Sequence, residues 1–322
     1  MKTLKENKIS KKNRYPRKVY NMYDTAKLLK RFLLNRSPLN YKTENVSCTP
    51  FFIIGSGRSG NTLLRAMLTS HSEISIPPES YVLNRVIRKF HTYNFLEWDE
   101  LVKIVIGEFE SHQQFPTWDI NTNELYQRLK LLSKEKRTLA NIIDELYVYY
   151  SEVHFPGSQI WGDKTPLNTL GLNWLDSLFP NAKYIHIIRD GRDVANSYQK
   201  AGLYDLKYSC ERWNESITRA KKFGRKKERQ QYYEVQYEDI VRNPKDELKK
   251  ICNFLNIKFE ESMLSFYENI GGLGDTSLSH HKNLNNSVNK NSIGKWEHEL
   301  SLNEKEYVNS NLEKNLKMLG YK

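Results

Sequence analysis

The segment Gly55-Ser56-Gly57-Arg58-Ser59-Gly60-Asn61-Thr62 decides the fold of this chain. It has the spacing of a phosphate-binding loop, in which glycine, four residues, glycine, lysine and then serine or threonine connect a strand to a helix. An apolar run at 51–54 precedes the segment and a helical pattern at 61–70 follows it. The lysine position holds Asn61, and the positive charge lies inside the loop at Arg58. Because an NTPase needs that lysine on its β- and γ-phosphates, the loop predicts a different phosphate-bearing donor.

A second segment indicates which donor. The largely apolar run 183–188 predicts a buried parallel strand, Arg189 follows it, and Ser197 comes eight residues later on an expected helix. Together with the glycine-rich loop, this pattern resembles the two nucleotide-binding signatures of sulfotransferases, which use 3′-phosphoadenosine-5′-phosphosulfate (PAPS). The resemblance covers roughly residues 50–320 and is strongest to the tyrosylprotein branch. Its further motifs are Trp161–Pro166, Leu178–Lys183, Tyr237–Asp239, Ser277–Ser279 and Gly294–Trp296.

Strand and helix patterns alternate along the chain, which predicts an α/β fold. We expect a P-loop-like, three-layer α/β/α domain with a central parallel sheet over 49–322, after a basic N-terminal arm at 1–48. A helical insertion at about 92–156 is expected to roof the acceptor site. The expected strands are 51–55, 73–76, 159–162, 183–188 and 231–236. The expected helices are 61–70, 80–91, 122–134, 138–151, 168–178, 191–200, 206–224, 244–255, 260–269 and 303–318.

The net charge of +12 over 322 residues is concentrated in the arm. Residues 1–50 contain 13 Lys or Arg against 3 Asp or Glu, which accounts for +10 of the total. The remaining +2 gives no basic surface of the kind that nucleic-acid binding requires, so no nucleic-acid partner is expected. Three unevenly spaced cysteines do not form a disulfide framework and indicate a reducing compartment.

The arm contains neither a secretory apolar core nor a stretch of about 20 apolar residues, so we expect no signal peptide and no membrane-spanning helix. A cytoplasmic location follows as an expectation. Apolar and basic residues between Tyr23 and Arg36 suit a short amphipathic helix. Two interpretations stay open. The helix either packs on the domain or makes a peripheral contact with an anionic membrane.

The resemblance assigns the donor-binding residues. The loop amides at the start of a helix form an anion nest, with Arg58 neutralising the 5′-phosphosulfate. Arg189 and Ser197 would hold the 3′-phosphate, as a forked arginine and a hydroxyl two helical turns further on. The set of nucleotide-binding residues is completed by Ser59, Gly60, Asn61, Thr62, Tyr237 and, in a loop that closes over the adenosine, Lys290. The expected product is adenosine 3′,5′-bisphosphate, and the reaction needs no metal.

Sulfuryl transfer depends on alignment and on stabilisation of charge at the leaving oxygen. The resemblance places Lys164 at that bridging oxygen, where a flexible ammonium group suits the task. It assigns Glu79, which follows the second expected strand, as the base that accepts the proton of the acceptor hydroxyl. Arg58 completes the catalytic set. The alternative bases are His280 and His281, whereas His186 lies within an apolar strand and is expected in the core.

The expected acceptor is inferred from one position at which this chain differs from the tyrosylprotein enzymes. Tyrosylprotein enzymes have an arginine two residues after the base, and here that position is Tyr81. Arg85 aligns with another family arginine, and Ser277 is a further expected acceptor contact. The aromatic ring and an insertion rich in Phe, Tyr and Trp favour a small or lipid-like alcohol or phenol, such as a sterol. A tyrosine peptide and a glycan remain alternatives.

Two other functional classes compete with sulfuryl transfer. A P-loop nucleotide kinase is disfavoured by Asn61 and by the lack of a placed set of Mg²⁺ ligands. A non-catalytic nucleotide-binding module is disfavoured by the simultaneous presence of Arg58, Glu79 and Lys164.

Overall fold

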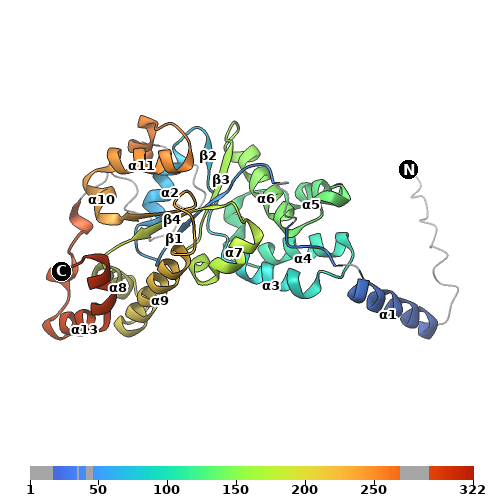
Figure 1. Cartoon of the computed structure of the whole chain (residues 1–322), viewed down its shortest axis with the longest axis horizontal. Helices are drawn as coiled ribbons and strands as arrows, with labels where there is room; N and C mark the ends of the chain where they lie inside the picture. The colour runs from blue at the N-terminus through green and yellow to red at the C-terminus, as the bar shows by residue number, and fades with distance from the viewer. Residues whose placement is uncertain (1–16, 35, 41–45, 269–289) are drawn as a thin grey trace, which may run out of the picture.

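The computed structural model describes residues 17–34, 36–40, 46–268 and 290–322. Its centre is a parallel sheet, which has five strands among these residues, in the order β2-β3-β1-β4-β5 (Figure 1). In the register, Phe52 lies between Asp163 and Tyr184. The predicted parallel sheet is therefore confirmed. The strands are β1 (Phe51–Ile54), β2 (Ile74–Ser75), β3 (Ile160–Lys164), β4 (Lys183–Ile188) and β5 (Tyr232–Gln236).

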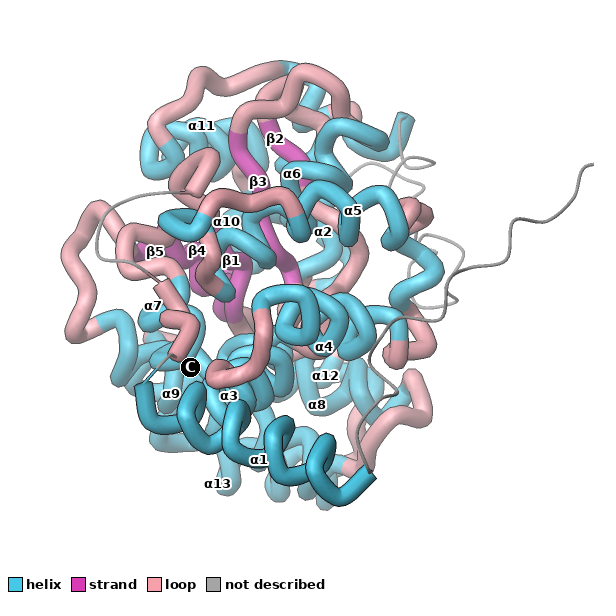
Figure 2. Tube along the Cα trace, turned by 90° about the vertical axis from the view of Figure 1, so that its right-hand side faces the viewer, coloured by secondary structure: helices cyan, strands magenta, loops and turns pink. Residues whose placement is uncertain are grey.

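Helices cover both faces of the sheet because alternate residues of a buried strand point in opposite directions. Phe51 and Ile53 pack in a core with α2 (Asn61–Thr69), α10 (Tyr237–Arg242) and α11 (Pro244–Leu255). Phe52 packs on the opposite side in a second core. The helices of that core include α3 (Leu83–Tyr93), α6 (Leu139–His154), α7 (Leu172–Leu178) and α9 (Leu206–Gly224). In Figure 2 the strands lie below α11 and above α3 and α9. With a core on each face of the sheet, the three-layer prediction is confirmed.

A third apolar cluster joins the end of β4 to the C-terminal part of the chain. Ile188 packs with side chains of α8 (Gly191–Lys200), α9 and α13 (Leu302–Leu319). A Ser301–Glu304 capping box starts α13, and Gly320 ends it with a φ of 83°. This cluster holds α8, which begins two residues after Arg189, against the rest of the domain.

The predicted helix boundaries were wrong in several places. Helix α4 (Trp98–Glu110) was not predicted, although Glu97 and Glu100 form a capping box at its start. Its β-branched run Val102–Ile106 resembles a strand locally, and tertiary packing overrides that preference. The short α10 was also missed. The expected helix at 260–269 is two 3₁₀ turns, Glu261–Leu264 and Phe266–Glu268. The helix expected at 122–134 is α5, Thr122–Lys130.

The aromatic residues of the insertion form a core of their own. Trp98, Phe109, Phe115 and Trp118 are all buried, and the last three rings contact one another. The cavity left beside Phe109 and Phe115 has a volume of about 10 Å³, too small for any acceptor. These buried side chains therefore stabilise the insertion, and the roof over the acceptor site stays a prediction.

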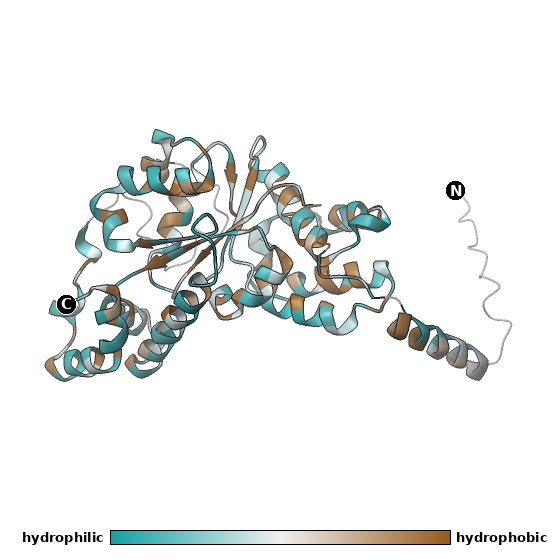
Figure 3. Cartoon of the chain, in the orientation of Figure 1, coloured by the Kyte–Doolittle hydropathy of each residue, from teal (hydrophilic) through white to brown (hydrophobic). Residues whose placement is uncertain are grey.

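Helix α1 (Arg17–Leu34) lies at the far end of the molecule from the C-terminus (Figure 1). Arg31 donates hydrogen bonds to the carbonyls of Phe95 and Leu96 and forms an ion pair with Glu97. Apolar side chains of the helix are nevertheless exposed, for example Leu33 at 75%. Figure 3 shows hydrophobic residues, in brown, at the end of α1 nearest the domain. Within the described residues, no helix combines the length and apolar character needed to cross a membrane.

Candidate active site

The candidate active site lies where the parallel strands end. Because all five strands run in the same direction, the residues that follow them meet at one edge of the sheet. The phosphate-binding loop follows β1, and the segment leading to Glu79 follows β2. The residues at or directly after the ends of β3, β4 and β5 are Lys164, Arg189 and Tyr237.

The phosphate-binding loop has the strand–loop–helix context predicted for it. Two glycines are required because tyrosine rings lie against the backbone. A Cβ atom on Gly57 would lie 2.2 Å from the Tyr198 hydroxyl, and one on Gly60 would lie 2.2 Å from the Tyr237 ring. Gly60 also has a φ of 94°, which disfavours other residues. Tyr198 was not predicted as a loop contact, and no local sequence signal indicates it.

Two side chains of the loop have different roles in the structure. Asn61 Nδ2 donates to the Ser56 carbonyl at 2.7 Å, so this side chain braces the loop from inside. Ser59 is 1% exposed, and its hydroxyl has no hydrogen-bond partner in the described structure. Burying a hydroxyl without a hydrogen-bond partner costs free energy. The Ser59 hydroxyl is therefore suited to donate a hydrogen bond to a ligand atom such as a phosphate oxygen.

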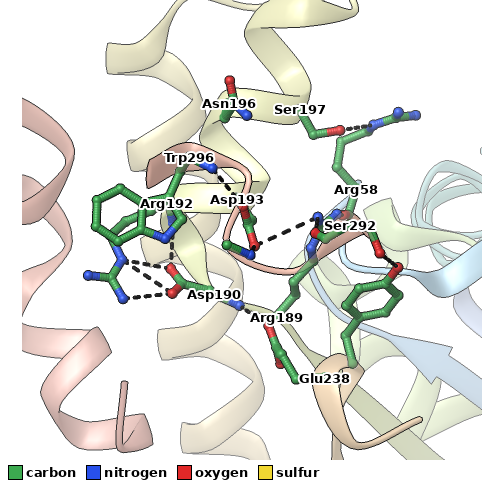
Figure 4. Close-up of polar contacts among 12 residues, drawn as sticks. Arg58, Arg189, Asp190, Arg192, Asp193, Asn196, Ser197, Glu238, Ser292 and Trp296 are labelled. Carbon is green, nitrogen blue, oxygen red and sulfur yellow. Dashed lines mark hydrogen bonds and ion pairs between the residues drawn. The ribbon is translucent and has the colours of Figure 1, made fainter. Parts of the chain in front are cut away.

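Arg58, expected at the 5′-phosphosulfate, lies together with Arg189 and Ser197, expected at the 3′-phosphate (Figure 4). Arg58 Nε donates to Ser197 Oγ at 3.0 Å, and Arg189 Nη1 donates to the Arg58 carbonyl at 2.9 Å. Burial and the charge of Arg189 lower the pKa of Arg58. Arg189 Nε is buried and has no hydrogen-bond partner among the described residues. Two guanidinium groups and an unpaired hydrogen-bond donor at one position favour the binding of an anion.

The segment around Ser292 lies over this cationic cluster. Arg189 Nη2 donates to the Ser292 carbonyl at 2.5 Å, and the Ser292 and Tyr237 hydroxyls are 2.6 Å apart. Asp193 holds the segment in place, accepting hydrogen bonds from the backbone of Gly294 and Trp296 (Figure 4). Ser292 and Asp193 were not predicted from the sequence, although both are within four residues of predicted ones.

Other predicted nucleotide-binding residues are close to the same place. Tyr237 stacks under Arg189, whose guanidinium carbon is 4.7 Å from the ring centre. Lys290 is exposed at the start of the 3₁₀ turn Lys290–Ser292. The Arg192 guanidinium forms an ion pair with Asp190 and lies over the ring of Trp296, so this side chain stabilises the local structure.

Glu79 and Lys164 form an ion pair at the other end of the loop. Lys164 Nζ is 2.5 Å from Glu79 Oε1 and 3.4 Å from Thr62 Oγ1. The lysine side chain is fully buried, whereas 17% of the glutamate side chain is exposed. The predicted base, the predicted leaving-group cation and the start of α2 are thus in direct contact, although they are distant in sequence.

The predicted acceptor residues have partners of their own. Tyr81 stacks on His112, with ring centres 4.6 Å apart. Arg85 forms an ion pair with Glu108 of α4, at 2.5 Å, and donates to Ser111. This contact between α3 and α4 was not predicted, because α4 itself was missed.

Some expected residues fall outside this arrangement. Ser277, His280 and His281 lie outside the described residues. His186 is fully buried in β4, with Nδ1 2.8 Å from the Tyr232 hydroxyl, and burial lowers the pKa of its imidazole. Its expected core position is confirmed.

Comparisons of this chain with known proteins find sulfotransferases. The chain is 27% identical over 266 residues to protein-tyrosine sulfotransferase A of Caenorhabditis elegans, a match covering 77% of this chain and 61% of the relative. It is 25% identical over 264 residues to protein-tyrosine sulfotransferase 2 of Gallus gallus, covering 76% and 62%. The match thus spans less than two thirds of these two relatives.

A solved structure shares the fold. The sulfotransferase domain of the Synechococcus PCC 7002 olefin synthase superposes with a TM-score of 0.57 at 23% identity, covering 84% of this chain and 97% of that domain. Residues 50–261, from the start of β1 to the turn after α11, match the family profile described as the sulfotransferase family. A match over this much of the chain settles its membership: the chain belongs to the sulfotransferase family.

Proposed function

We propose that this chain transfers the sulfuryl group of PAPS to a hydroxyl of an acceptor molecule. The observation that carries the proposal is the contact of Lys164 with both Glu79 and Thr62 at the start of α2. A carboxylate base and a cation for the leaving oxygen lie side by side at the rim of a phosphate-binding loop. The family membership of residues 50–261 supports the same reaction class.

The residues present fit the donor. Within the part of the chain that the structure describes, the Ser59 hydroxyl and Arg189 Nε are buried without hydrogen-bond partners, and each can bind a phosphate oxygen. Arg58, held by Ser197, places its charge between the loop and α8. These groups supply two anion-binding positions. The 5′-phosphosulfate would bind at the loop and the 3′-phosphate at Arg189 and Ser197.

In the proposed reaction, Glu79 accepts the proton of the acceptor hydroxyl as its oxygen bonds to sulfur. The bond between sulfur and the bridging phosphate oxygen breaks at the same time. Lys164 moves its ammonium from Glu79 to that oxygen and stabilises the developing charge. The products are a sulfate ester and adenosine 3′,5′-bisphosphate, and the proton remains on Glu79 until solvent removes it.

The test is an assay of the purified chain with radiolabelled PAPS and a panel of phenols, sterols, glycans and tyrosine peptides. Label transferred to a hydroxyl, without added metal, supports the proposal. Transfer of phosphate from ATP with magnesium, and none from PAPS, would favour the nucleotide-kinase alternative. Tight binding of PAPS with no acceptor in any class would favour a non-catalytic nucleotide-binding module.

For the acceptor, we favour a small or lipid-like phenol or alcohol without acidic flanks. The support is the Arg85–Glu108 ion pair, because an arginine held by a carboxylate is a poor partner for acidic residues of a peptide. Lys89 also pairs with Glu108. The names of the relatives favour the alternative, a tyrosine in a peptide.

Kinetics with paired acceptors decide between them. A kcat/KM more than about tenfold higher for an acidic tyrosine peptide than for a phenol or sterol, some 1.4 kcal/mol, would overturn our preference. Tyr81→Arg should raise the ratio of peptide to phenol activity. Lys103→Arg, on the exposed surface of α4, is the matched control and should leave the ratio unchanged.

We also propose that α1 brings the enzyme to an anionic membrane surface. Arg31 fastens the helix to the domain, while Met22, Leu29 and Leu33 are 73%, 58% and 75% exposed. Exposed apolar side chains beside basic residues suit the interface of an anionic bilayer. The excess of basic residues in 1–50 adds attraction to the same surface.

A further inference from the structure

The turn that carries Glu79 is held in a strained conformation. Tyr81, two residues after Glu79, has a φ of 54°, in the left-handed region that residues with a Cβ atom rarely adopt. The backbone tightens here further, since the Val82 amide donates to the Ser80 carbonyl at 2.6 Å. Such a conformation persists only where surrounding contacts impose it.

The contacts that impose it come from the residue after Lys164. Thr165 Oγ1 accepts a hydrogen bond from the Ser80 amide at 3.0 Å and lies 3.1 Å from the Ser80 hydroxyl. On the other side of the turn, the Tyr81 ring stacks on His112. Both Ser80 and Thr165 are buried, so water does not replace these bonds.

The hydroxyl of Thr165 is itself oriented by a hydrogen bond to Asp163. It donates to Asp163 Oδ2 at 3.2 Å, which turns its lone pairs toward Ser80. Asp163 also accepts hydrogen bonds from the Tyr147 hydroxyl at 2.6 Å and from Asn168 Nδ2 at 2.7 Å. Three donors surround this carboxylate in a fully buried site, so its position is closely defined.

We propose that Thr165, oriented by Asp163, is a positioning residue that holds the Glu79 turn in register with Lys164. Two consecutive residues at the end of β3 then position Glu79. Lys164 contacts the Glu79 carboxylate, and Thr165 holds the backbone of Ser80, the residue after Glu79. This inference rests on the proposed function, because it assigns Thr165 to the base of that reaction. Neither Thr165 nor Asp163 touches the donor-binding residues Arg58 or Arg189 in the described contacts.

The test compares Thr165→Val with Thr165→Ser. Valine has the shape of threonine without the hydroxyl, so it releases the Ser80 amide, whereas serine keeps the hydrogen bond. We expect Thr165→Val to lower kcat by about 10- to 100-fold, since small misplacements of catalytic groups have effects of that order. The affinity for adenosine 3′,5′-bisphosphate should stay within about twofold, and Thr165→Ser should restore kcat to within about threefold of wild type.

A second variant covers the case in which Thr165→Val fails to fold. Asp163→Asn keeps the side-chain shape but removes the charge that orients Thr165, and it should lower kcat while leaving bisphosphate affinity unchanged. The proposal is wrong if a folded Thr165→Val or Asp163→Asn protein retains wild-type kcat. It is also wrong if serine is no better than valine, or if nucleotide affinity falls in parallel with kcat. A wild-type protein that transfers nothing from PAPS would instead refute the proposed function.

Discussion

At the residue scale, the ion pair between Glu79 and Lys164 is the feature on which the proposed reaction depends. A positioned base contributes about 10²- to 10⁴-fold to a rate. Glu79→Gln should therefore reduce kcat by that factor and leave the affinity for adenosine 3′,5′-bisphosphate unchanged. Calorimetry and labelled-PAPS kinetics measure the two quantities. Glu215→Gln, on the surface of α9, is the control and should behave as wild type.

A Glu79→Gln enzyme with full activity on every acceptor would remove Glu79 from the role of base. The alternative bases are His280 and His281, and substitution of one of these two histidines by Gln would then be expected to abolish turnover.

The 3′-phosphate position gives a second prediction at this scale. Arg189 and Ser197 should make the protein bind adenosine 3′,5′-bisphosphate about 10- to 100-fold more tightly than AMP, because a hydrogen bond to a charged group contributes about 1.5–3 kcal/mol. Ser197→Ala should reduce that preference, and isothermal calorimetry with both nucleotides measures it. Ser177→Ala, on the exposed side of α7, is the control. Equal affinities of the wild-type protein for the two nucleotides would contradict the assignment.

At the scale of elements, the loop between β1 and α2 tolerates no side chain at Gly60. A Cβ atom there would collide with the Tyr237 ring at 2.2 Å, and the φ of 94° adds strain. Gly60→Ala should thus lower both the melting temperature and the affinity for adenosine 3′,5′-bisphosphate, the latter by at least about tenfold because Tyr237 and the loop must move. Thermal denaturation and calorimetry measure the two effects.

The same substitution elsewhere provides the control. Gly107 lies within α4, where an added Cβ atom meets no atom of the described residues within 4 Å. Gly107→Ala should stabilise the fold by about 0.5–1 kcal/mol, since alanine is the better helix former, with no change in nucleotide affinity. An unchanged nucleotide affinity in Gly60→Ala would show that the loop does not bind the donor.

At the scale of the whole molecule, the arm and the domain are predicted to have separable roles. Removing residues 1–18 takes away eight of the 13 basic residues of 1–50. The truncated protein should keep its turnover on water-soluble acceptors and bind less to phosphatidylserine vesicles, since each basic residue near such a surface contributes about 1 kcal/mol. Sedimentation with anionic and with neutral vesicles measures the binding. Equal sedimentation of the full-length and truncated proteins would contradict a role of the arm in membrane binding.

The substitution of Leu29 and Leu33 by Ser separates the two contributions to that binding. The double variant retains every basic residue, so its loss of vesicle binding would report the apolar face of α1 alone. If it binds as wild type does, charge rather than apolar contact accounts for the attraction.

Much of the fold and of the arrangement of the candidate site could be predicted from the sequence, because the determinants of both are local. A glycine-rich turn between a strand and a helix forms an amide cradle wherever it occurs. The order of parallel strands then places Glu79, Lys164 and Arg189 at one edge of the sheet. Residue type, spacing and strand polarity carry this information, and each can be read over ten or twenty residues.

The contacts between distant segments were decided only by the tertiary structure. Helix α4 forms from a β-branched run because the insertion buries Val102 and Val105, and only then can Glu108 pair with Arg85. Two hydrogen bonds likewise join residues more than 80 positions apart. Arg189 donates to the Ser292 carbonyl, and the Ser80 amide donates to the Thr165 hydroxyl. Such contacts depend on the packing of side chains from several elements, and no single stretch of sequence contains that information.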